Sequence, residues 1–324
     1  MGGDNAPSAI VEGAIKAVER GDIAASDIVL IGAKDRIGEL IREKSKKHLD
    51  FGIENANQTV EMNESPVDAL RKKRESSIAV GIHLLKARTV DAMISAGNTG
   101  AMVAFSTLRL GMLKGVKRPG IAVCFTSLSG ACTIIDVGAN IHCKPMHLYH
   151  YGIMASSYMR HVMNTENPRV AMINIGEENE KGTALLKETR NLFKDSHINF
   201  IGNLEGQDIF SGKCDVLVCE GFVGNVVLKV AEGLGAYIYK FLLSDMDKEE
   251  GDSEKKAISM GILKDIYSRL DYAEYGGAPL LGVNGNVFIC HGRSDPKAIS
   301  NAIRFARLSV DNKLIENIAS GLES

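Results

Sequence analysis

The chain has 324 residues, 45% of them hydrophobic and 24% charged, which is enough to bury a core in one large or two medium domains. The formal net charge of −2 argues against a protein that coats nucleic acid by bulk electrostatics. The longest uncharged run, residues 119–135, is shorter than the roughly 20 residues of a membrane-spanning helix. The six cysteines contain no CxxC pair, and the N-terminus lacks the features of a signal peptide. We therefore expect buried free thiols in a cytoplasmic protein.

Short runs rich in Val and Ile alternate with amphipathic helical stretches along most of the chain. The expected strands are residues 27–31, 91–95, 120–125, 133–137, 169–175, 199–202, 215–219 and 286–290. The expected helices include residues 8–20, 65–86 and 181–193. This alternation predicts an α/β fold with a largely parallel sheet.

Residues 233–275 break the alternation, because no convincing strand is found there. A densely charged stretch separates two helical patterns, and the second pattern places Ile258, Ile262 and Ile266 four residues apart. This helical excursion could pack on the body of the protein or on a second subunit. Alternatively, its apolar stripe could contact a bilayer surface.

One glycine-rich turn follows an expected strand and opens a helical pattern, Ser95-Ala-Gly-Asn-Thr-Gly-Ala101. Small residues allow backbone N–H groups to converge on an anion, and the helix dipole favours negative charge. The turn matches neither a P-loop nor a dinucleotide fingerprint. It is either a simple turn or a phosphate site, whose predicted contacts are Ser95, Gly97, Asn98, Thr99 and Gly100.

Two more expected strands end in polar residues, at the kind of edge where α/β proteins bind ligands. Asp136 and Asn140 follow one strand, although Asn140 could simply cap the next helix. Gly176 and Glu177 follow another, and Glu177 could instead serve the dipole of the next helix. Lys181 lies one turn further on, where an ammonium group could neutralise a phosphate or an oxyanion.

Further candidates come from the C-terminal half. Gly224 and Asn225 follow the strand at 215–219, where they could supply donors to an oxyanion or only begin a helix. His291 ends the last expected strand and is either functional or a core histidine. The spacing of the histidines at 142, 147 and 150 fits no standard zinc pattern, so no metal is expected.

A compact basic run could dock an acidic partner by electrostatic steering, or it could be an ordinary solvated face. It consists of Arg71, Lys72, Lys73 and Arg74.

Taken in order, these segments resemble the bacterial phosphate acyltransferase family, the acyl-acyl carrier protein:phosphate acyltransferases. The resemblance includes Met1-Gly-Gly-Asp-Asn-Ala-Pro7 and Tyr275-Gly-Gly-Ala-Pro-Leu-Leu-Gly282. The other matching segments are 65–77, 95–101, 136–140, 174–182, 219–229 and 291–292. Two departures stand out: the family has a short strand before the segment that begins here at Met1, and Glu220 replaces the family's Asp.

The resemblance implies a three-layer α/β/α sandwich with a mostly parallel sheet, like isocitrate and isopropylmalate dehydrogenases and phosphotransacetylases. Residues 1–324 would form a single two-lobed domain with an active-site cleft. The excursion at 233–275 would serve a homodimer and membrane contact through Ile258, Ile262 and Ile266.

The implied activity is transfer of a fatty-acyl group from acyl carrier protein to inorganic phosphate, giving acyl phosphate for phospholipid synthesis. Lys181, Asn225 and His291 would be catalytic, without metal or cofactor. The implied partners are acyl carrier protein, inorganic phosphate, the membrane surface and a downstream membrane glycerol-3-phosphate acyltransferase, and the location is cytoplasmic and peripherally membrane-associated. Alternatives are a phosphotransacetylase that uses coenzyme A, a nicotinamide-dependent dehydrogenase, and a non-catalytic membrane scaffold.

Overall fold

The computed structural model describes residues 1–248, 261 and 274–323. The helices are α1 (Ser8–Glu19), α2 (Lys34–Lys44), α3 (Pro66–Lys72), α4 (Ser77–Lys86), α5 (Thr99–Phe105), α6 (Pro145–His161), α7 (Ala184–Lys194), α8 (Gly221–Lys248), α10 (Pro296–Asp311) and α11 (Leu314–Glu323). The strands are β1 (Val29–Gly32), β2 (Gly52–Asn55), β3 (Ala92–Ser95), β4 (Gly120–Ser127), β5 (Gly130–Ile135), β6 (Val170–Ile173), β7 (Phe200–Leu204), β8 (Val216–Val218), β9 (Ala278–Leu281) and β10 (Asn286–Ile289).

The described strands form a central eight-stranded sheet in the order β3-β10-β9-β4-β5-β8-β6-β7. Pairings at its two ends are parallel, but β9 and β4 run antiparallel to each of their neighbours. The sheet is therefore mixed, which confirms the α/β class and corrects the expectation of a largely parallel sheet at its centre. Since three antiparallel pairings separate them, β3 and β10 run opposite to β5, β8 and β6. Their carboxyl ends lie at opposite edges of the sheet.

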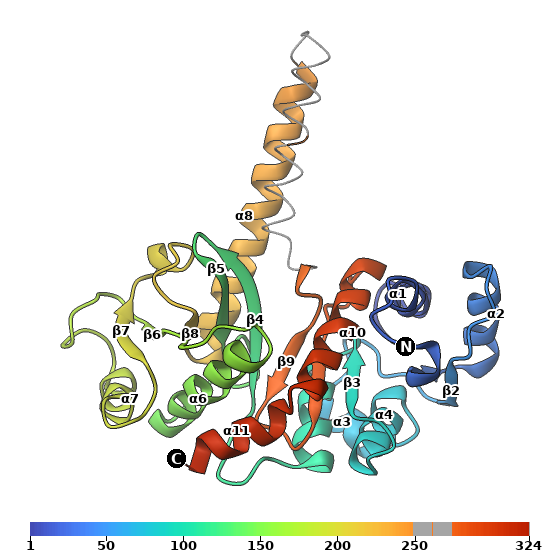
Figure 1. Ribbon diagram of the computed structural model, residues 1–324, viewed down its shortest axis with the longest axis horizontal. Coiled ribbons are helices and arrows are strands. Elements are labelled where there is room, and N and C mark those ends of the chain that lie inside the picture. Colours follow the sequence, from blue (N-terminus) through green and yellow to red (C-terminus); the bar gives the residue numbers. More distant parts are fainter. Residues whose placement is uncertain (249–260, 262–273, 324) are drawn as a thin grey trace.

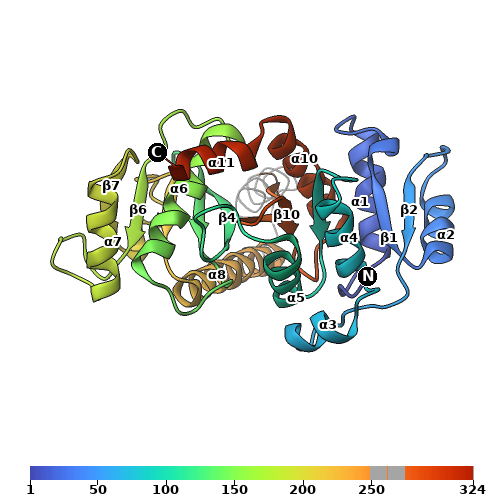
Figure 2. The same cartoon turned by 90° about the horizontal axis from the view of Figure 1, so that it is seen from below.

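Helices cover both faces of this sheet (Figure 2). One hydrophobic cluster packs α4, α5 and the first turns of α8 against one face. A second cluster packs α6, α10 and α11 against the other. Strands covered on both faces are apolar on both faces, as β8 is with its three fully buried residues.

Helix α8 is the longest described helix, and its C-terminal part projects away from the body of the protein (Figure 1). The expected helical excursion begins within it, since residues 233–248 continue the helix without a break. The stripe of Ile258, Ile262 and Ile266 lies outside the described residues. No helix in the described part of the chain is long and apolar enough to cross a membrane.

Several element boundaries differ from those expected. The helix expected at 65–86 is divided into α3 and α4, because the side chain of Ser76 accepts a hydrogen bond from the Ala79 N–H and starts a new helix. In the same way, Thr183 caps α7, so Lys181 lies in a loop rather than on the helix. Strands β2 and β9 were not predicted.

A groove separates the two-stranded sheet of β1 and β2 from the central sheet. Its volume is about 600 Å³, and backbone edges of β1 and β3 line it together with Met1. Helix α4 closes one side, where Ile31 and Met93 both approach Gly81. Figure 2 shows the N-terminus between these elements. No described strand pairs with the second edge of β1 or of β3, so the groove between them is open beside Met1.

Candidate active site

A buried carboxylate organises the turn after β5. Asp136 is fully buried, and its Oδ1 accepts hydrogen bonds from the backbone N–H groups of Ile121, Gly138 and Ala139 at 2.9–3.1 Å. Burial raises the pKa of this carboxyl, while the same N–H groups oppose that rise. Asp136 therefore holds the turn in place, rather than contacting a substrate as the sequence predicted.

Asn140 completes the turn. Its backbone N–H donates to Asp136 Oδ2 at 2.7 Å, and its side-chain amide donates to the Pro119 carbonyl oxygen at 2.6 Å. The amide also lies 2.9 Å from the Tyr151 hydroxyl. These two groups occupy both N–H donors of the Asn140 side-chain amide. The Asn140 side chain therefore supports the turn and has no N–H donor left for the predicted ligand contact.

The first turn of α8 packs tightly against the Asp136 turn. A Cβ on Gly221 would lie 2.9 Å from Asp136 Oδ2, and one on Gly224 would lie 2.9 Å from Cys219 Sγ and still closer to the Asp136 carbonyl oxygen. Glycine is therefore required at both positions, because any side chain would clash with the turn. Gly224 serves this packing, whereas the sequence predicted that it contacts a ligand.

Glu220 caps α8, a role that the sequence did not reveal. Its carboxylate accepts hydrogen bonds from the N–H groups of Phe222 at 2.6 Å and Val223 at 3.2 Å. A negative group at this position also suits the helix dipole. The available signal was an acidic residue directly before a helical pattern.

Asn225 is the exposed polar group of this helix start. It faces the Asp136 turn, since a Cβ on Gly138 would lie 3.8 Å from both Cβ and Oδ1 of Asn225. The side chain can therefore present its amide to a ligand at the carboxyl ends of β5 and β8.

The loop after β6 carries Lys181. Asn174 holds this loop closed, because its side-chain amide donates to the Lys181 carbonyl oxygen at 3.2 Å. The Lys181 stem packs over buried Gly176, whose added Cβ would lie 3.0 Å from Lys181 Cγ. The ammonium is exposed, and no carboxylate in the described part of the chain pairs with it. Glu177 instead pairs with Lys213 at 3.0 Å.

Sheet topology brings these groups to one edge. β5, β8 and β6 are neighbours and parallel, so the segments that carry Gly138, Asn225 and Lys181 all follow carboxyl ends at the same edge. This edge, with loops 136–140 and 174–182 and the start of α8 at 220–225, is termed the Lys181 edge. It combines an exposed cation with an exposed amide donor, which suits an anionic nucleophile or a developing oxyanion.

The glycine-rich turn at 95–100 lies at the opposite edge. Asn98 is buried, its Oδ1 accepts from the Ala101 N–H at 2.9 Å, and its amide donates to the carbonyl oxygens of Glu61, Met62 and Glu64 at 3.0–3.1 Å. The Asn98 side chain is therefore committed to capping α5 and fixing the 61–64 loop, and cannot also bind phosphate. Ser95 Oγ likewise accepts from the Gly97 N–H at 3.2 Å. Thr99 is exposed.

His291 also lies at that opposite edge, after β10. Burial is the main cause that lowers its pKa, and the positive charge of Lys229 on α8 lowers it further. Its Nδ1 accepts a hydrogen bond from the Arg293 N–H at 3.1 Å, which places any ring proton of the neutral form on Nε2. The lowered pKa favours the neutral imidazole, in which the Nε2–H is the ring N–H that would assist a leaving thiol, and this assisting role of His291 stays a prediction.

The basic run is partly neutralised within the chain. Lys73 is bound to Glu64 at 2.6 Å, and Lys72 pairs with Asp68 at 3.1 Å. Arg71 and Arg74 are exposed at and beyond the end of α3. Any docking surface here therefore depends mainly on these two arginines.

All six cysteines are free thiols, five of them buried. Within the described residues, no group of three or more His, Cys, Asp or Glu side chains could hold a metal ion.

The fold is similar to that of two phosphotransacetylases of known structure. A phosphotransacetylase from Streptococcus pyogenes superposes with a TM-score of 0.58 at 13% identity, covering 96% of this chain and 99% of that one. The EutD phosphotransacetylase from Staphylococcus aureus gives 0.57 at 11% identity, covering 93% and 99%. At these identities the similarity concerns the fold alone.

The family follows from sequence similarity. A model of the fatty acid synthesis protein family matches residues 1–317. A phosphate acyltransferase from Thermoanaerobacterium thermosaccharolyticum is 43% identical over 100% of this chain and 95% of its own length. One from Heliobacterium modesticaldum is 44% identical over 98% and 94%. The chain belongs to the phosphate acyltransferase family of fatty acid synthesis, which confirms the resemblance found in its motifs.

Proposed function

We propose that the chain transfers a fatty-acyl group from the thioester of acyl carrier protein to inorganic phosphate and releases an acyl phosphate for phospholipid synthesis. Family membership supports acyl transfer to phosphate. The assignment of the site rests on one observation: exposed Lys181 lies on the loop after β6, and exposed Asn225 lies on the first turns of α8 after the neighbouring parallel strand β8.

The proposed reaction is a direct displacement. A phosphate oxygen attacks the thioester carbonyl carbon, and the C–O bond forms as the carbonyl oxygen becomes an oxyanion. The C–S bond then breaks, and the proton that the hydrogen phosphate gives up passes through water to the leaving thiolate, so that a free thiol and the acyl phosphate are released. Lys181 neutralises the incoming phosphate or the oxyanion, and the Asn225 amide donates a second hydrogen bond. A thiolate is a good leaving group, so a strong general acid is not needed, and His291 would assist the departure of the thiol. No metal or cofactor is required.

We further propose a homodimer built on α8. Exposed apolar side chains recur every four residues along this helix, at Phe222, Val226, Val230 and Leu234, with exposed fractions of 45–63%. Such a stripe is costly to leave in water and suits a second copy of the same helix. In a homodimer, one copy can present the exposed Thr99 and the backbone of its 95–100 turn, which remain predicted phosphate contacts, to the Lys181 edge of the other.

The dimer has a simple test in sedimentation velocity. Wild-type protein should sediment as a dimer and Val230→Asp as a monomer. A wild-type monomer at all concentrations would contradict the dimer and leave the catalytic proposal to be tested separately.

Membrane association and delivery of the product to a membrane glycerol-3-phosphate acyltransferase also belong to the proposal. The stripe of Ile258, Ile262 and Ile266 would make the contact. If wild-type protein binds liposomes and the Ile262→Asp variant does not, the proposed membrane contact is supported. Equal binding by wild type and variant would contradict a contact through this stripe.

The acyl donor decides between the proposal and its nearest alternative. Initial rates are measured with palmitoyl-acyl carrier protein and with palmitoyl-coenzyme A at equal concentrations. We expect product from the carrier-protein substrate. Product from coenzyme A alone would identify a phosphotransacetylase, and protein that binds the carrier but gives no product from either donor would favour a scaffold.

A further inference from the structure

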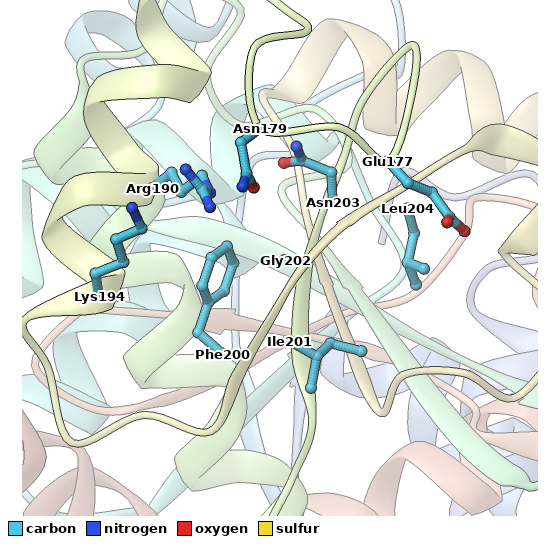
Figure 3. Close-up of a pocket in the computed structure, with 9 residues that line it drawn as sticks. All are labelled: Glu177, Asn179, Arg190, Lys194, Phe200, Ile201, Gly202, Asn203 and Leu204. Carbon is cyan, nitrogen blue, oxygen red and sulfur yellow. The ribbon is translucent and has the colours of Figure 1, made fainter.

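A second pocket lies beside the Lys181 edge, between α7, β7 and the 175–181 loop. Its volume is about 410 Å³. Its lining includes Arg190 and Lys194 from α7, Asn179 from the loop and Asn203 from β7 (Figure 3). Since β7 is the last strand of the sheet, the pocket opens at the side of the molecule.

The pocket carries uncompensated positive charge. Arg190 and Lys194 are four residues apart on one face of α7, and neither forms an ion pair with a carboxylate among the residues described. Figure 3 shows the Arg190 guanidinium pointing toward the Asn179 amide. Glu177 is the one carboxylate of the lining, but it points away from the two cations and pairs with Lys213. An anion is therefore the complementary ligand.

Asn203 gives a second, independent indication of which chemical groups the ligand carries. Its side chain is only 7% exposed, and its amide nitrogen donates to the Glu178 carbonyl oxygen at 3.2 Å. Its Oδ1 is buried without any hydrogen-bond partner. Figure 3 shows this amide directed toward Asn179, inside the pocket. A buried acceptor without a partner is unfavourable, so the ligand should also bring an N–H or O–H donor.

The pocket and the Lys181 edge share one loop. Asn203 holds the loop at Glu178, Asn179 lines the pocket, and Lys181 follows two residues later. A ligand anchored in the pocket can therefore lead toward Lys181.

We propose that this pocket binds the phosphate ester of a phosphopantetheine arm that carries the acyl thioester. Arg190 and Lys194 bind the phosphate, and Asn203 Oδ1 accepts from a neighbouring N–H or O–H of the arm. The proposal rests on the proposed function, because it supplies the binding site for the donor of that reaction. Acyl carrier protein and coenzyme A both carry this group, so the experiment includes both.

Binding is measured first, without catalysis, by calorimetric titration of wild-type protein and the double variant Arg190→Ala/Lys194→Ala. 4′-Phosphopantetheine is compared with pantetheine, which lacks the phosphate. We expect wild type to prefer the phosphorylated ligand by at least about tenfold, and the double variant to lose that preference. Lys187→Ala, on the same helix but outside the pocket, is the matched control and should keep it. Equal binding of both ligands by wild type would overturn the proposal, whatever the enzyme assay shows.

Kinetics with acyl donors then connect the pocket to the reaction. For palmitoyl-acyl carrier protein and palmitoyl-4′-phosphopantetheine, we expect the double variant to raise KM about tenfold or more while kcat is retained. Palmitoyl-pantetheine should show no difference between the two proteins. An equal loss with all three donors would mean a general structural effect and would contradict the proposal. Palmitoyl-coenzyme A is assayed in the same way, and a KM effect with it but not with the carrier protein would place the coenzyme, and not the carrier arm, in the pocket.

Discussion

Gly224 lies directly against the carbonyl oxygen of Asp136, so closely that a Cβ at this position would overlap that oxygen. This contact joins the start of α8 to the turn after β5. It sets the position of Asn225, the next residue on the helix, at the Lys181 edge.

Replacing Gly224 by Ala should therefore destabilise the protein by about 3 kcal/mol or more, because backbone atoms on both sides must shift. Gly233→Ala, on the same helix with no atom within 4 Å of the added Cβ, should instead raise the free energy of unfolding by roughly 0.5–1 kcal/mol. Urea unfolding followed by circular dichroism measures both. Equal effects at the two positions would show that the contact with Asp136 does not constrain the helix.

Lys181→Ala should lower kcat by roughly 100- to 1000-fold, as loss of a charged oxyanion or phosphate contact does in other enzymes. Because Lys181 is exposed and lies in a loop, the melting temperature of the Lys181→Ala protein should differ little from that of wild type. Lys187→Ala, exposed on α7, serves as the control for loss of a nearby positive charge. An unchanged kcat in folded Lys181→Ala protein would rule out this role.

The stability of the protein should fall as the pH is lowered below about 6.5. Burial lowers the pKa of His150 and of His147 on α6, and the positive charges of His147 and Lys117 lower that of His150 further. At pH values between the lowered pKa of these histidines in the folded protein and their ordinary pKa of 6.5, the histidines bind protons in the unfolded chain but not in the folded one. Acidification through this window therefore favours unfolding.

Free energies of unfolding at pH 7.5 and 5.5 test this effect for wild type and His150→Gln. The difference between the two pH values should be smaller in the variant, and the comparison cancels the contributions of other groups, including buried Asp136. An identical pH dependence of both proteins would contradict the prediction.

The groove between β1 and β3 should accept a β-strand. Its two walls are strand edges, and α4 and α1 enclose it with apolar side chains. Burial lowers the pKa of the Met1 amino group at its mouth. Five or six alternating Val and Ile residues added before Met1 should therefore raise the free energy of unfolding by about 2 kcal/mol or more. A Gly/Ser extension of equal length is the control, and no difference between the two would show that the groove does not bind a strand.

Much of the fold could be predicted from local sequence, because most strands are short Val- and Ile-rich runs bounded by turns. β2 was missed because Gly52–Asn55 contains a single large apolar residue, and β9 because Ala278–Leu281 includes Pro279. Proline is unusual in a central strand, and here it lies where β9 pairs antiparallel with β10.

The candidate site was predicted only in part, for reasons that depend on distant contacts. Lys181 and Asn225 were identified from strand-end turns, and these local signals also pointed to Asn98 and Asp136. Local sequence does not show that Asn98 donates to backbone more than 30 residues away, or that Asp136 is fully buried. Nor does it show that β9 and β4 reverse the strand direction, which puts the 95–100 turn and Lys181 at opposite edges.

The most direct measurement is trapping of acyl phosphate. Purified protein is incubated with palmitoyl-acyl carrier protein, with and without inorganic phosphate, and hydroxylamine is then added to convert any acyl phosphate to the hydroxamate. Because hydroxylamine also attacks thioesters, the unreacted donor without protein gives the baseline. We predict hydroxamate well above this baseline only when both protein and phosphate are present. Hydroxamate at the baseline, from a folded protein that binds the carrier, would contradict acyl transfer to phosphate.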